Sequence, residues 1–519
     1  MVEAERLWQF RKIKFQTVFR YQYVISKTRL DIYSFQTATL NNWHISYGIA
    51  LPLHLIYDKM GNQVGVLLGI AVAKNGLVQE ILKLDIAASD PDFFEKFELL
   101  MKDFAGRYAI FLSFGNNTRY YCDPVGMIGA VYENDHHRIA SSPLLTIDRP
   151  ISPHPLYDHE KMENFNGKYS IFHTRDANIR RLNPNCYLDM ETFKENRFWP
   201  KDEVFAAPKG EYLDIMDEIM STTKFNIEQI ADAYPTALPL SGGQDSRLLA
   251  TMAGDAIGKV DQIYTHVNNW MNTVDADIAA KVASELGQDH QVHRKGEQPF
   301  SKKIVAQFNQ MYSLAIGYPA TIPLEFANGN VKNIKSDAVI LRGHQTDLLR
   351  AVFVRKGKEK WTDFDWQLKL LLILPNDQFD QNLADKFRPD YRNWYESLPS
   401  NAKEKSVDFM FLEIYYSSTI GTTFPGLWRN FYISPYNSRR LIELSLKFDE
   451  EFRKNSLPVF CINQLQNPKV AGIYYVFDYL SKETKLDGKA SIKLCNERAA
   501  KRTTQIEKLI DSLGNAKLS

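Results

Sequence analysis

The stretch PLSGGQDSRLLA, residues 239–250, constrains the fold of this chain more than any other. The apolar run YPTALPL leads into it, and RLLATMAG, a pattern typical of a helix, follows it. Gly242 and Gly243 permit backbone conformations that other residues avoid, and they let the chain approach a ligand closely. Successive amide N–H groups and the positive end of the helix dipole would then attract an anion. The stretch therefore predicts a strand, a phosphate-binding loop and a helix.

The side chains of this loop refine the prediction. Ser241 and Ser246 supply hydroxyl donors for phosphate oxygens, but the carboxylate of Asp245 would repel them. A Mg²⁺ ion between this carboxylate and the phosphates would remove the conflict. The loop matches neither GxxxxGK[ST] nor GxGxxG, the patterns of other nucleotide-binding proteins. The alternative interpretation is an ordinary turn, in which Asp245 caps the helix or lies in its first turn.

The first 205 residues are expected to form a β-rich domain. Apolar runs alternate with polar turns, and YAIFLSF, GNNT and RYYCD in succession predict a hairpin. AVYEND and HRIASS repeat this pattern, and further strands are expected at KYSIFH and NCYLDM. The composition becomes polar around KDEVFAAPKGEY, which places a domain boundary near residue 205.

Residues 206–519 are expected to form a second domain of the α/β class. Apolar residues recur every three or four positions in residues 211–232, which predicts one or two amphipathic helices. Strand patterns at residues 262–268 and 337–343 alternate with a helical pattern at residues 275–287, so we expect a parallel sheet with helices on both faces. The remaining chain is mostly helical in pattern and ends in a charged terminal helix.

Composition argues against several classes of protein. The formal net charge is +1 and no face is evidently basic, which argues against nucleic-acid binding. The longest apolar runs, from Val66 and from Leu368, are too short to cross a membrane, and the first residues lack the apolar core of a signal peptide. The four cysteines are far apart, which argues against zinc and disulfide frameworks. We therefore expect a cytoplasmic protein that binds neither nucleic acid nor membranes.

The loop SGGQDS resembles the pyrophosphate-binding loop of the ATP pyrophosphatases, and its surroundings resemble the asparagine synthetase family. FAGRYAIFLSF, YYCDPVGMIGAVYE and HRIASSP are similar to the second part of the glutamine amidotransferase domain of that family, and IRRLNPNCYLDM is similar to the segment that closes it. DADIAAKVASELGQDHQVH, ILRGHQTDLLRAVF and SPYNSRRLIELSLKF resemble later segments of the synthetase domain. Asp275 and Asp347 stand at recurring acidic positions of the first two of these.

This resemblance implies both a fold and a reaction. Residues 1–205 would be an Ntn-hydrolase-like domain, and residues 206–519 a PP-loop synthetase domain of the adenine nucleotide alpha hydrolase type. In the family, a carboxylate attacks the α-phosphate of ATP to give an acyl-adenylate and pyrophosphate, and ammonia or an amine then displaces AMP. The implied cofactors are ATP and Mg²⁺. The implied partners are a small-molecule or peptide carboxylate and an amine donor, and a homodimer is plausible.

The resemblance also marks candidate site residues. Asp245 and Asp347 would hold Mg²⁺ and would be catalytic together with Arg342. Arg342 and Arg350 could neutralise phosphate or a substrate carboxylate, or could form surface ion pairs, and His344 could orient a substrate. The candidate nucleotide-binding residues are Leu240, Ser241, Gly242, Gly243, Gln244, Asp245, Ser246, His266 and Gly343.

The chain also departs from the family. The glutaminase nucleophile of the family is an N-terminal cysteine, whereas this sequence starts Met1-Val2 and has no cysteine before Cys122. We therefore expect a degenerate amidotransferase domain, with ammonia, an amine or a separate glutaminase as the nitrogen source. Gln345 replaces a glycine, and Leu348 replaces a glutamate of the acyl-acceptor region, which puts aspartate as the substrate in doubt.

Other positions are open or structural. Ser438 stands in place of an aspartate, and Arg440 and Glu443 are expected to pair on one helix face. Cys122 and Cys186 are expected to be core residues. The lysine that would assist pyrophosphate departure cannot be assigned among Lys469, Lys485, Lys489 and Lys493.

Three alternatives to an aspartate-using ligase stay open at this point. One is a non-catalytic homologue that binds ATP or a partner. Another is amidation of a sugar acid or a peptide. The third is an RNA-modifying pyrophosphatase such as a thiolase, against which the lack of paired cysteines counts.

Overall fold

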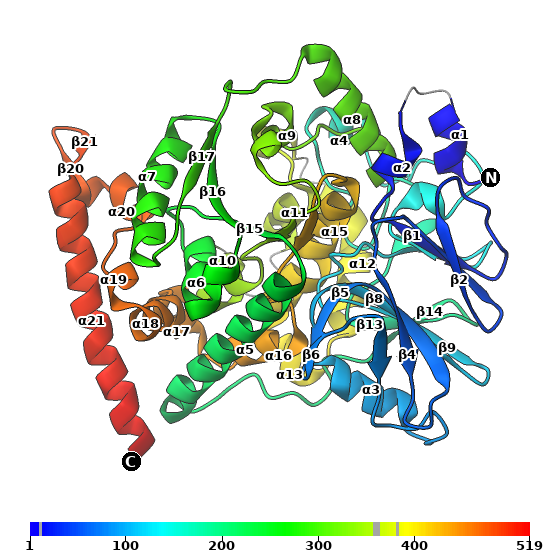
Figure 1. Ribbon diagram of the computed structural model, residues 1–519, viewed down its shortest axis with the longest axis horizontal. Helices are drawn as coiled ribbons and strands as arrows, with labels where there is room; N and C mark the ends of the chain where they lie inside the picture. Colours follow the sequence, from blue (N-terminus) through cyan, green and yellow to red (C-terminus); the bar gives the residue numbers. More distant parts are fainter. Residues whose placement is uncertain (10–12, 357–363, 380–382, 519) are drawn as a thin grey trace. The chain divides into compact units, whose positions relative to one another are not determined.

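The computed structural model describes residues 1–9, 13–356, 364–379 and 383–518 (Figure 1). Contacts within the fold divide the chain into two compact units, each built from three segments. The first break lies close to the boundary expected at residue 205, but the first unit also takes in two later segments. The first unit comprises Met1–Glu203, Lys302–Ile322 and Lys356–Phe431, and the second comprises Val204–Ser301, Pro323–Arg355 and Tyr432–Ser519.

Two sheets contain the named strands of the first unit. These strands are β1 (Tyr23–Ser26), β2 (Gln36–Leu40), β3 (Trp43–Tyr47), β4 (Leu53–Tyr57), β5 (Gln63–Ala73), β6 (Gly76–Leu77), β7 (Ile81–Lys83), β8 (Ala105–Phe114), β9 (Asn117–Cys122), β10 (Val131–Glu133), β11 (Arg138–Ala140), β12 (Ile179–Arg181), β13 (Cys186–Asp189) and β14 (Lys194–Arg197). The six-stranded sheet has the order β12-β10-β11-β1-β3-β2, with antiparallel neighbours. The eight-stranded sheet has the order β14-β13-β9-β8-β5-β4-β7, with β6 paired to β5. Its neighbours are antiparallel except β4 and β7.

The local sequence explains the centre of the larger sheet. Every residue from Val64 to Val72 is buried, as expected for β5, which has strands on both sides. β8 and β9 form the predicted hairpin, with Phe114 opposite Asn117 and only Gly115 and Asn116 between them. Gly115 has φ 60°, the left-handed conformation that tight hairpin turns require. β10 and β11 form the second expected antiparallel pair.

One expected strand does not form. KYSIFH contains a single isolated bridge, between His173 and Arg180, because Ile171 and Phe172 adopt φ 55° and 62°. The Ser170 backbone is bonded to a side chain instead of a neighbouring strand. Its amide donates to the Tyr157 hydroxyl (3.1 Å), which in turn donates to the Ser170 carbonyl (3.0 Å). The prediction of a strand at this segment is therefore wrong.

Short helices complete the first unit, and the segment from Met410 to Tyr416 is a π-helix. The helices are α1 (Glu3–Gln9), α2 (Phe15–Val18), α3 (Phe93–Met101), η1 (Pro143–Leu145), α4 (His159–Asn164), α8 (Lys302–Ile316), α11 (Phe364–Leu372), η7 (Asn376–Gln378), α12 (Leu383–Glu396), α13 (Ser400–Lys403), α14 (Ser406–Phe409), η8 (Met410–Tyr416), α15 (Ile420–Thr423) and η9 (Phe424–Gly426).

A five-stranded sheet lies in the second unit. Its strands are β15 (Thr236–Pro239), β16 (Gln262–Val267), β17 (Gln291–Arg294), β18 (Val339–Leu341) and β19 (Phe431–Ile433). Their order is β17-β16-β15-β18-β19, and β15 runs parallel to both of its neighbours. β16 and β17 are also parallel, which confirms the expectation of a parallel sheet. A further small hairpin joins β20 (Lys485–Leu486) and β21 (Lys489–Ala490).

Helices make up most of the rest of the second unit, and Figure 1 shows α7 beside β16. They are η2 (Lys209–Glu211), α5 (Tyr212–Ala233), α6 (Asp245–Met252), η3 (Gly254–Lys259), α7 (Trp270–Glu285), α9 (Leu324–Ala327), η4 (Asn330–Asn333), η5 (Thr346–Arg350), α10 (Val352–Lys356), α16 (Arg439–Leu446), α17 (Glu450–Lys454), α18 (Leu457–Gln466), α19 (Pro468–Ala471), α20 (Val476–Leu480), η10 (Lys482–Thr484) and α21 (Ile492–Leu518).

These helices confirm the periodicity predictions. α5 is one continuous helix at the predicted position, and it buries Ile215, Met216 and Ile219 in a core shared with α6, α16, α17, α18 and α21. Each such buried side chain contributes about 1.5–3 kcal/mol. α7 begins earlier than predicted, because the Asn269 side chain accepts a hydrogen bond from the amide of Asn272 (3.1 Å) and caps the helix. Within the described residues, no helix is long and apolar enough to span a membrane.

Candidate functional site

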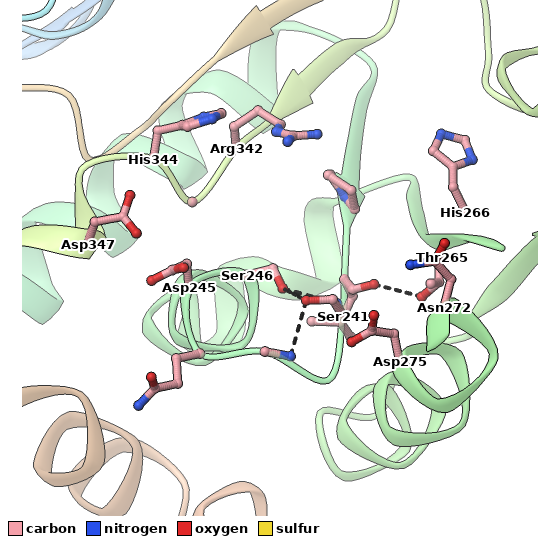
Figure 2. A pocket seen from close by; sticks show the side chains of 15 residues that line it. Ser241, Asp245, Ser246, Thr265, His266, Asn272, Asp275, Arg342, His344 and Asp347 are labelled. Atoms are coloured by element: carbon pink, nitrogen blue, oxygen red, sulfur yellow. Dashed lines mark hydrogen bonds between the residues drawn. The ribbon is translucent and has the colours of Figure 1, made fainter. Parts of the chain in front are cut away.

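A cavity of about 310 Å³ opens at the carboxyl edge of the parallel sheet (Figure 2). The chain passes from β15 to β16 on one side and later places β18 on the other side, so the strand order reverses at β15. Open α/β sheets bind ligands outside the carboxyl ends of their strands at such a reversal. The lining residues are Pro239, Leu240, Ser241, Gly243, Gln244, Asp245, Ser246, Thr265, His266, Asn272, Asp275, Arg342, Gly343, His344 and Asp347.

The loop after β15 is held by its own side chains. The Ser241 amide donates to Oγ of Ser246 (3.0 Å), and the two hydroxyl oxygens lie 2.9 Å apart. The Gly243 amide donates to Oγ of Ser241 (3.2 Å), and the Gly242 amide donates to Oδ1 of Asp275 (3.1 Å). Three successive loop amides, which we expected to face an anion, therefore have acceptors within the chain. A bound anion would have to replace these acceptors.

The helix after the loop leaves its first turn open to the cavity. Gln244 is the N-cap residue and makes no side-chain cap, and Asp245 is the first helical residue. Asp245 therefore lies in the first turn without capping it. The first amide groups of a helix have no acceptor within the helix, and they attract an anion that lies close to this end.

The loop glycines are needed for space. Neither Gly242 nor Gly243 lies in the left-handed region, so the expectation of an unusual backbone there is wrong. A Cβ on Gly242 would lie 3.0 Å from Cδ1 of Ile278. Gly343 is more tightly placed, because a Cβ there would lie 2.8 Å from the carbonyl oxygen of Asp245. The segment after β18 thus packs directly against the start of α6.

Asp245 and Asp347 lie on the same side of the cavity (Figure 2). They share one cation, Arg350. Nη2 of Arg350 lies 2.6 Å from Oδ2 of Asp245 and 2.8 Å from Oδ1 of Asp347. Nε of Arg350 donates to Oδ1 of Asp245 (2.9 Å). Burial, with the charge of Asp347 second, raises the pKa of Asp245 to about 7, although Arg350 opposes the shift. The two carboxylates thus share a single guanidinium, and the raised pKa of Asp245 reflects burial and their mutual repulsion.

Arg342 and two histidines form another wall. No carboxylate pairs with the Arg342 guanidinium among the described residues, and its side chain lines the cavity. Burial, together with the charge of Arg342, lowers the pKa of His344 to about 3. Burial, then His293 and Arg342, lower the pKa of His266 to about 3. This wall therefore offers one positive charge and two neutral imidazoles to a ligand.

Gln345, Leu348 and Ser438, which differ from the pattern that the sequence resembles, have defined local surroundings. Gln345 has φ 69°, so it occupies the left-handed conformation that glycine adopts more easily. Leu348 is buried and does not line the cavity, so this position supplies no acceptor to a ligand. Ser438 caps α16, because its Oγ accepts a hydrogen bond from the amide of Leu441 (3.0 Å). Aspartate and serine are both good caps, which accounts for the exchange.

Most candidate residues line the cavity. Two named candidates are not among the lining residues: Arg350, and Gly242, whose carbonyl accepts a hydrogen bond from the amide of Val476 (2.9 Å). None of the candidate lysines Lys469, Lys485, Lys489 and Lys493 is among the lining residues. Arg440 and Glu443 form the predicted ion pair (3.4 Å), and Cys122 and Cys186 are buried as expected.

Sequence reasoning missed two contributors, Thr265 and Asn272, and did not foresee the role of Arg350, which it had named as a candidate cation. Thr265 lines the cavity and donates to the carbonyl of Leu240 (2.6 Å), and Asn272 lines the cavity from α7. Arg350 was not expected to bridge the two carboxylates. Its place three residues after Asp347 was the available signal, because residues at that spacing on a helical turn face each other.

The chain matches no protein-family model and no curated protein. Among the residues that the structure describes, no group of three or more histidine, cysteine, aspartate or glutamate side chains could hold a metal ion. Asp245 and Asp347 are two oxygen-donor groups, so a Mg²⁺ ion here would need further oxygen ligands from phosphate or water. The assignment of a function therefore rests on the site itself.

Proposed function

We propose that this chain is an ATP-dependent amide-forming ligase of the asparagine synthetase type. The observation that carries the proposal is a strand–loop–helix unit with two hydroxyls, at the strand-order reversal of a parallel sheet, facing a pair of carboxylates. In this proposal the second unit contains a PP-loop fold. The sheets of the first unit would be the counterpart of an Ntn-hydrolase-like amidotransferase domain.

The triphosphate would bind at the loop. The hydroxyls of Ser241 and Ser246 and the first amides of α6 are donors for the oxygens of the leaving pyrophosphate. Mg²⁺ would be held by Asp245 and Asp347 together with phosphate oxygens, and it would neutralise charge on the departing group. Arg342 would face the α-phosphate or the substrate carboxylate.

The reaction has two steps. A carboxylate oxygen of the substrate attacks the α-phosphorus, and the bond from this phosphorus to the bridging oxygen breaks, so pyrophosphate leaves with the electron pair. The nitrogen of ammonia or an amine then attacks the acyl carbon, the carbon–oxygen bond to AMP breaks, and the nitrogen loses a proton to solvent. Positioning and charge neutralisation would supply most of the acceleration.

The substrate is a carboxylate of a small molecule, a sugar acid or a peptide. Because Leu348 is buried, the acyl-acceptor region lacks the carboxylate that the family offers there, which favours a substrate other than aspartate. A separate glutaminase is an alternative source of ammonia.

The experiment is phosphorus NMR of ATP and Mg²⁺ with the protein, ammonium and a fractionated small-molecule extract of its source cells. We expect AMP and pyrophosphate with the wild type in certain fractions, and neither with Asp245→Ala. Asp255→Ala is the matched control, because the side chain of Asp255 is 80% exposed and pairs with Lys224. Formation of ADP would contradict the proposal, and so would failure of ATP to bind in a calorimetric titration.

A second candidate is a homologue that binds ATP without turning it over. The bridge from Arg350 to both carboxylates favours this alternative, since it occupies the groups that a catalytic Mg²⁺ would use. Tight ATP binding without AMP formation in any fraction would support it.

A further inference from the structure

The guanidinium of Arg350 is fixed by more contacts than a surface ion pair needs. Nε and Nη2 grip both oxygens of Asp245 at 2.9 and 2.6 Å, and Nη2 also reaches Asp347 at 2.8 Å. Nη1 donates to Oε1 of Gln244 (3.3 Å), which belongs to the loop. The side chain of Arg350 is only 16% exposed. All three guanidinium nitrogens are thus engaged with groups of the candidate site.

The turn that carries Arg350 is flanked by two residues in the left-handed backbone conformation. Gln345 and Ala351, which flank the turn of η5, have φ 69° and 45°. Non-glycine residues rarely adopt this left-handed conformation, and each instance costs of order 1–3 kcal/mol. The turn follows β18, which pairs in parallel with β15, and in this conformation both Asp347 and Arg350 lie close to Asp245, at the start of the helix that follows β15. Thr346 adds a hydrogen bond from Oγ1 to Oδ1 of Asp245 (3.3 Å).

A divalent cation without a nucleotide would compete poorly for this position. The carboxylate pair has no third histidine, cysteine, aspartate or glutamate beside it in the part of the chain described. A free metal ion would therefore gain only two carboxylate ligands. The protein would lose the bidentate contact between Arg350 and Asp245, which is among the stronger hydrogen-bonded pairs in proteins. A triphosphate would change this balance, because it offers Arg350 new acceptors and offers the metal further oxygen ligands.

We propose that Arg350 is a resident cation that holds the position between Asp245 and Asp347, so that the pair is closed to divalent metals until a triphosphate draws the guanidinium away. The nucleotide then precedes the metal or brings it. The part that concerns the triphosphate rests on the proposed ATP binding, whereas the part that concerns the free metal does not.

The first test uses Mn²⁺ alone, measured by the electron paramagnetic resonance signal of the unbound ion. We expect Arg350→Met to bind one Mn²⁺ tighter than the wild type by about ten-fold or more. Asp245→Asn in the Arg350→Met background should abolish this binding. Arg440→Met is the matched control, because Arg440 makes a bidentate contact with Glu218 at 2.6 and 2.8 Å and does not line the cavity.

Two results would overturn the proposal for the metal. One is tight Mn²⁺ binding by the wild type and by Arg350→Met alike. The other is no detectable Mn²⁺ binding by either protein. Thermal unfolding checks that Arg350→Met is folded. If it is not, Arg350→Lys carries the test, because an ammonium keeps the charge but cannot bridge both carboxylates in the same fork, and a gain over the wild type is again expected.

The second test separates this inference from the proposed function. ATP is titrated calorimetrically into the wild type, Arg350→Met and Arg440→Met. Each titration is done once with excess EDTA and once with Mg²⁺. We expect the wild type to bind metal-free ATP and Arg350→Met to bind it about ten-fold more weakly, with Arg440→Met unchanged. Binding that requires Mg²⁺ equally in all three would overturn the role of Arg350 toward the triphosphate. No ATP binding in either buffer would contradict the proposed function and would leave the Mn²⁺ result to be judged alone.

Discussion

Glu413 in the first unit and Asp245 in the second are both carboxylates held by an arginine, and their surroundings differ in the number of donors. Arg197 grips Glu413 at 2.6 and 2.9 Å, and the side chains of Trp394, Asn183 and Asn185 donate to the same two oxygens. Burial alone would raise the pKa of Glu413, but Arg197 and these neutral donors lower it below its usual value. The Glu413 carboxylate is fully buried, and both of its oxygens are saturated with hydrogen-bond donors.

Asp245 has fewer donors and a competitor. It shares its arginine with Asp347 and faces a cavity, and its pKa is raised to about 7 by burial and by the neighbouring charge. A saturated carboxylate has nothing left to offer a ligand, whereas Asp245 and Asp347 would both gain from an additional cation. The number of donors for each carboxylate oxygen therefore separates a structural ion pair from a ligand-binding one.

The largest effect should come from removing the charge of Glu413. Glu413→Gln leaves the side chain of Arg197, which is 11% exposed, without its counter-charge, and we expect a loss of about 3–5 kcal/mol in the free energy of unfolding. Urea unfolding measures it. Glu396→Gln is the control, because Glu396 is half exposed and pairs with Lys403, so its loss of stability should be much smaller. Equal losses in the two variants would show that the saturated pair is no more structural than a surface pair.

The same isosteric change at Asp245 should affect function and leave stability nearly intact. Asp245→Asn retains the shape of the side chain and removes one of two carboxylates that compete for Arg350, so the free energy of unfolding in urea should stay within about 1 kcal/mol of the wild type. AMP formation should fall by about 10²–10³-fold, as it does when a group that stabilises transition-state charge is removed. Asp255→Asn should change neither. Unfolding of Asp245→Asn as severe as that of Glu413→Gln would contradict the comparison.

The substitution Gly343→Ala tests how closely the segment between β18 and η5 must approach α6. The added Cβ would meet the carbonyl oxygen and carbon of Asp245 at 2.8 and 2.9 Å, and backbone atoms cannot turn aside. We expect Gly343→Ala to cost about 1–3 kcal/mol in urea unfolding and to weaken ATP binding. Gly258→Ala, where no atom lies within 4 Å of the added Cβ, is the control. A neutral Gly343→Ala would show that this approach is not required.

The effect that is smallest at neutral pH should come from a buried histidine, because its contribution to stability changes only as the pH falls. His293 is 3% exposed, and burial, with a smaller contribution from His290, lowers its pKa to about 4 although Glu297 opposes the shift. The unfolded chain therefore binds more protons than the folded one between about pH 6.5 and 4. Stability should fall by roughly 1–3 kcal/mol as the pH drops through this window. In His293→Gln the slope of the urea midpoint against pH should flatten, and an unchanged slope would refute this assignment.

Local features of the fold could be predicted from the sequence. The unit of β15, loop and α6 follows from an apolar run, two glycines and a helical pattern, and α5 follows from its period. The meeting of Asp245 and Asp347, 102 positions apart along the chain, was expected only from the family resemblance. The spacing of Asp347 and Arg350 indicates that they share a turn, but the contact from Arg350 to Asp245, which follows the neighbouring strand, could not be predicted.

The features of the fold that were predicted wrongly or not at all depend on contacts that the local sequence pattern does not record. KYSIFH alternates as a strand does, but contacts with Tyr157 and two left-handed residues override the pattern. The return of residues 302–322 and 356–431 to the first unit depends on packing between distant segments, which no local period records.

The first unit is built from three separate segments of the chain, and this has a consequence for the order in which its parts are synthesised. Arg197 and Glu413 are 216 positions apart, so a ribosome needs roughly 10–40 s to reach the second after making the first. During that interval the nascent first unit lacks Glu413 and the segment that carries it, while the earlier segments of the second unit are already being made. The amino-terminal sheets are therefore synthesised well before the last segment that completes their unit.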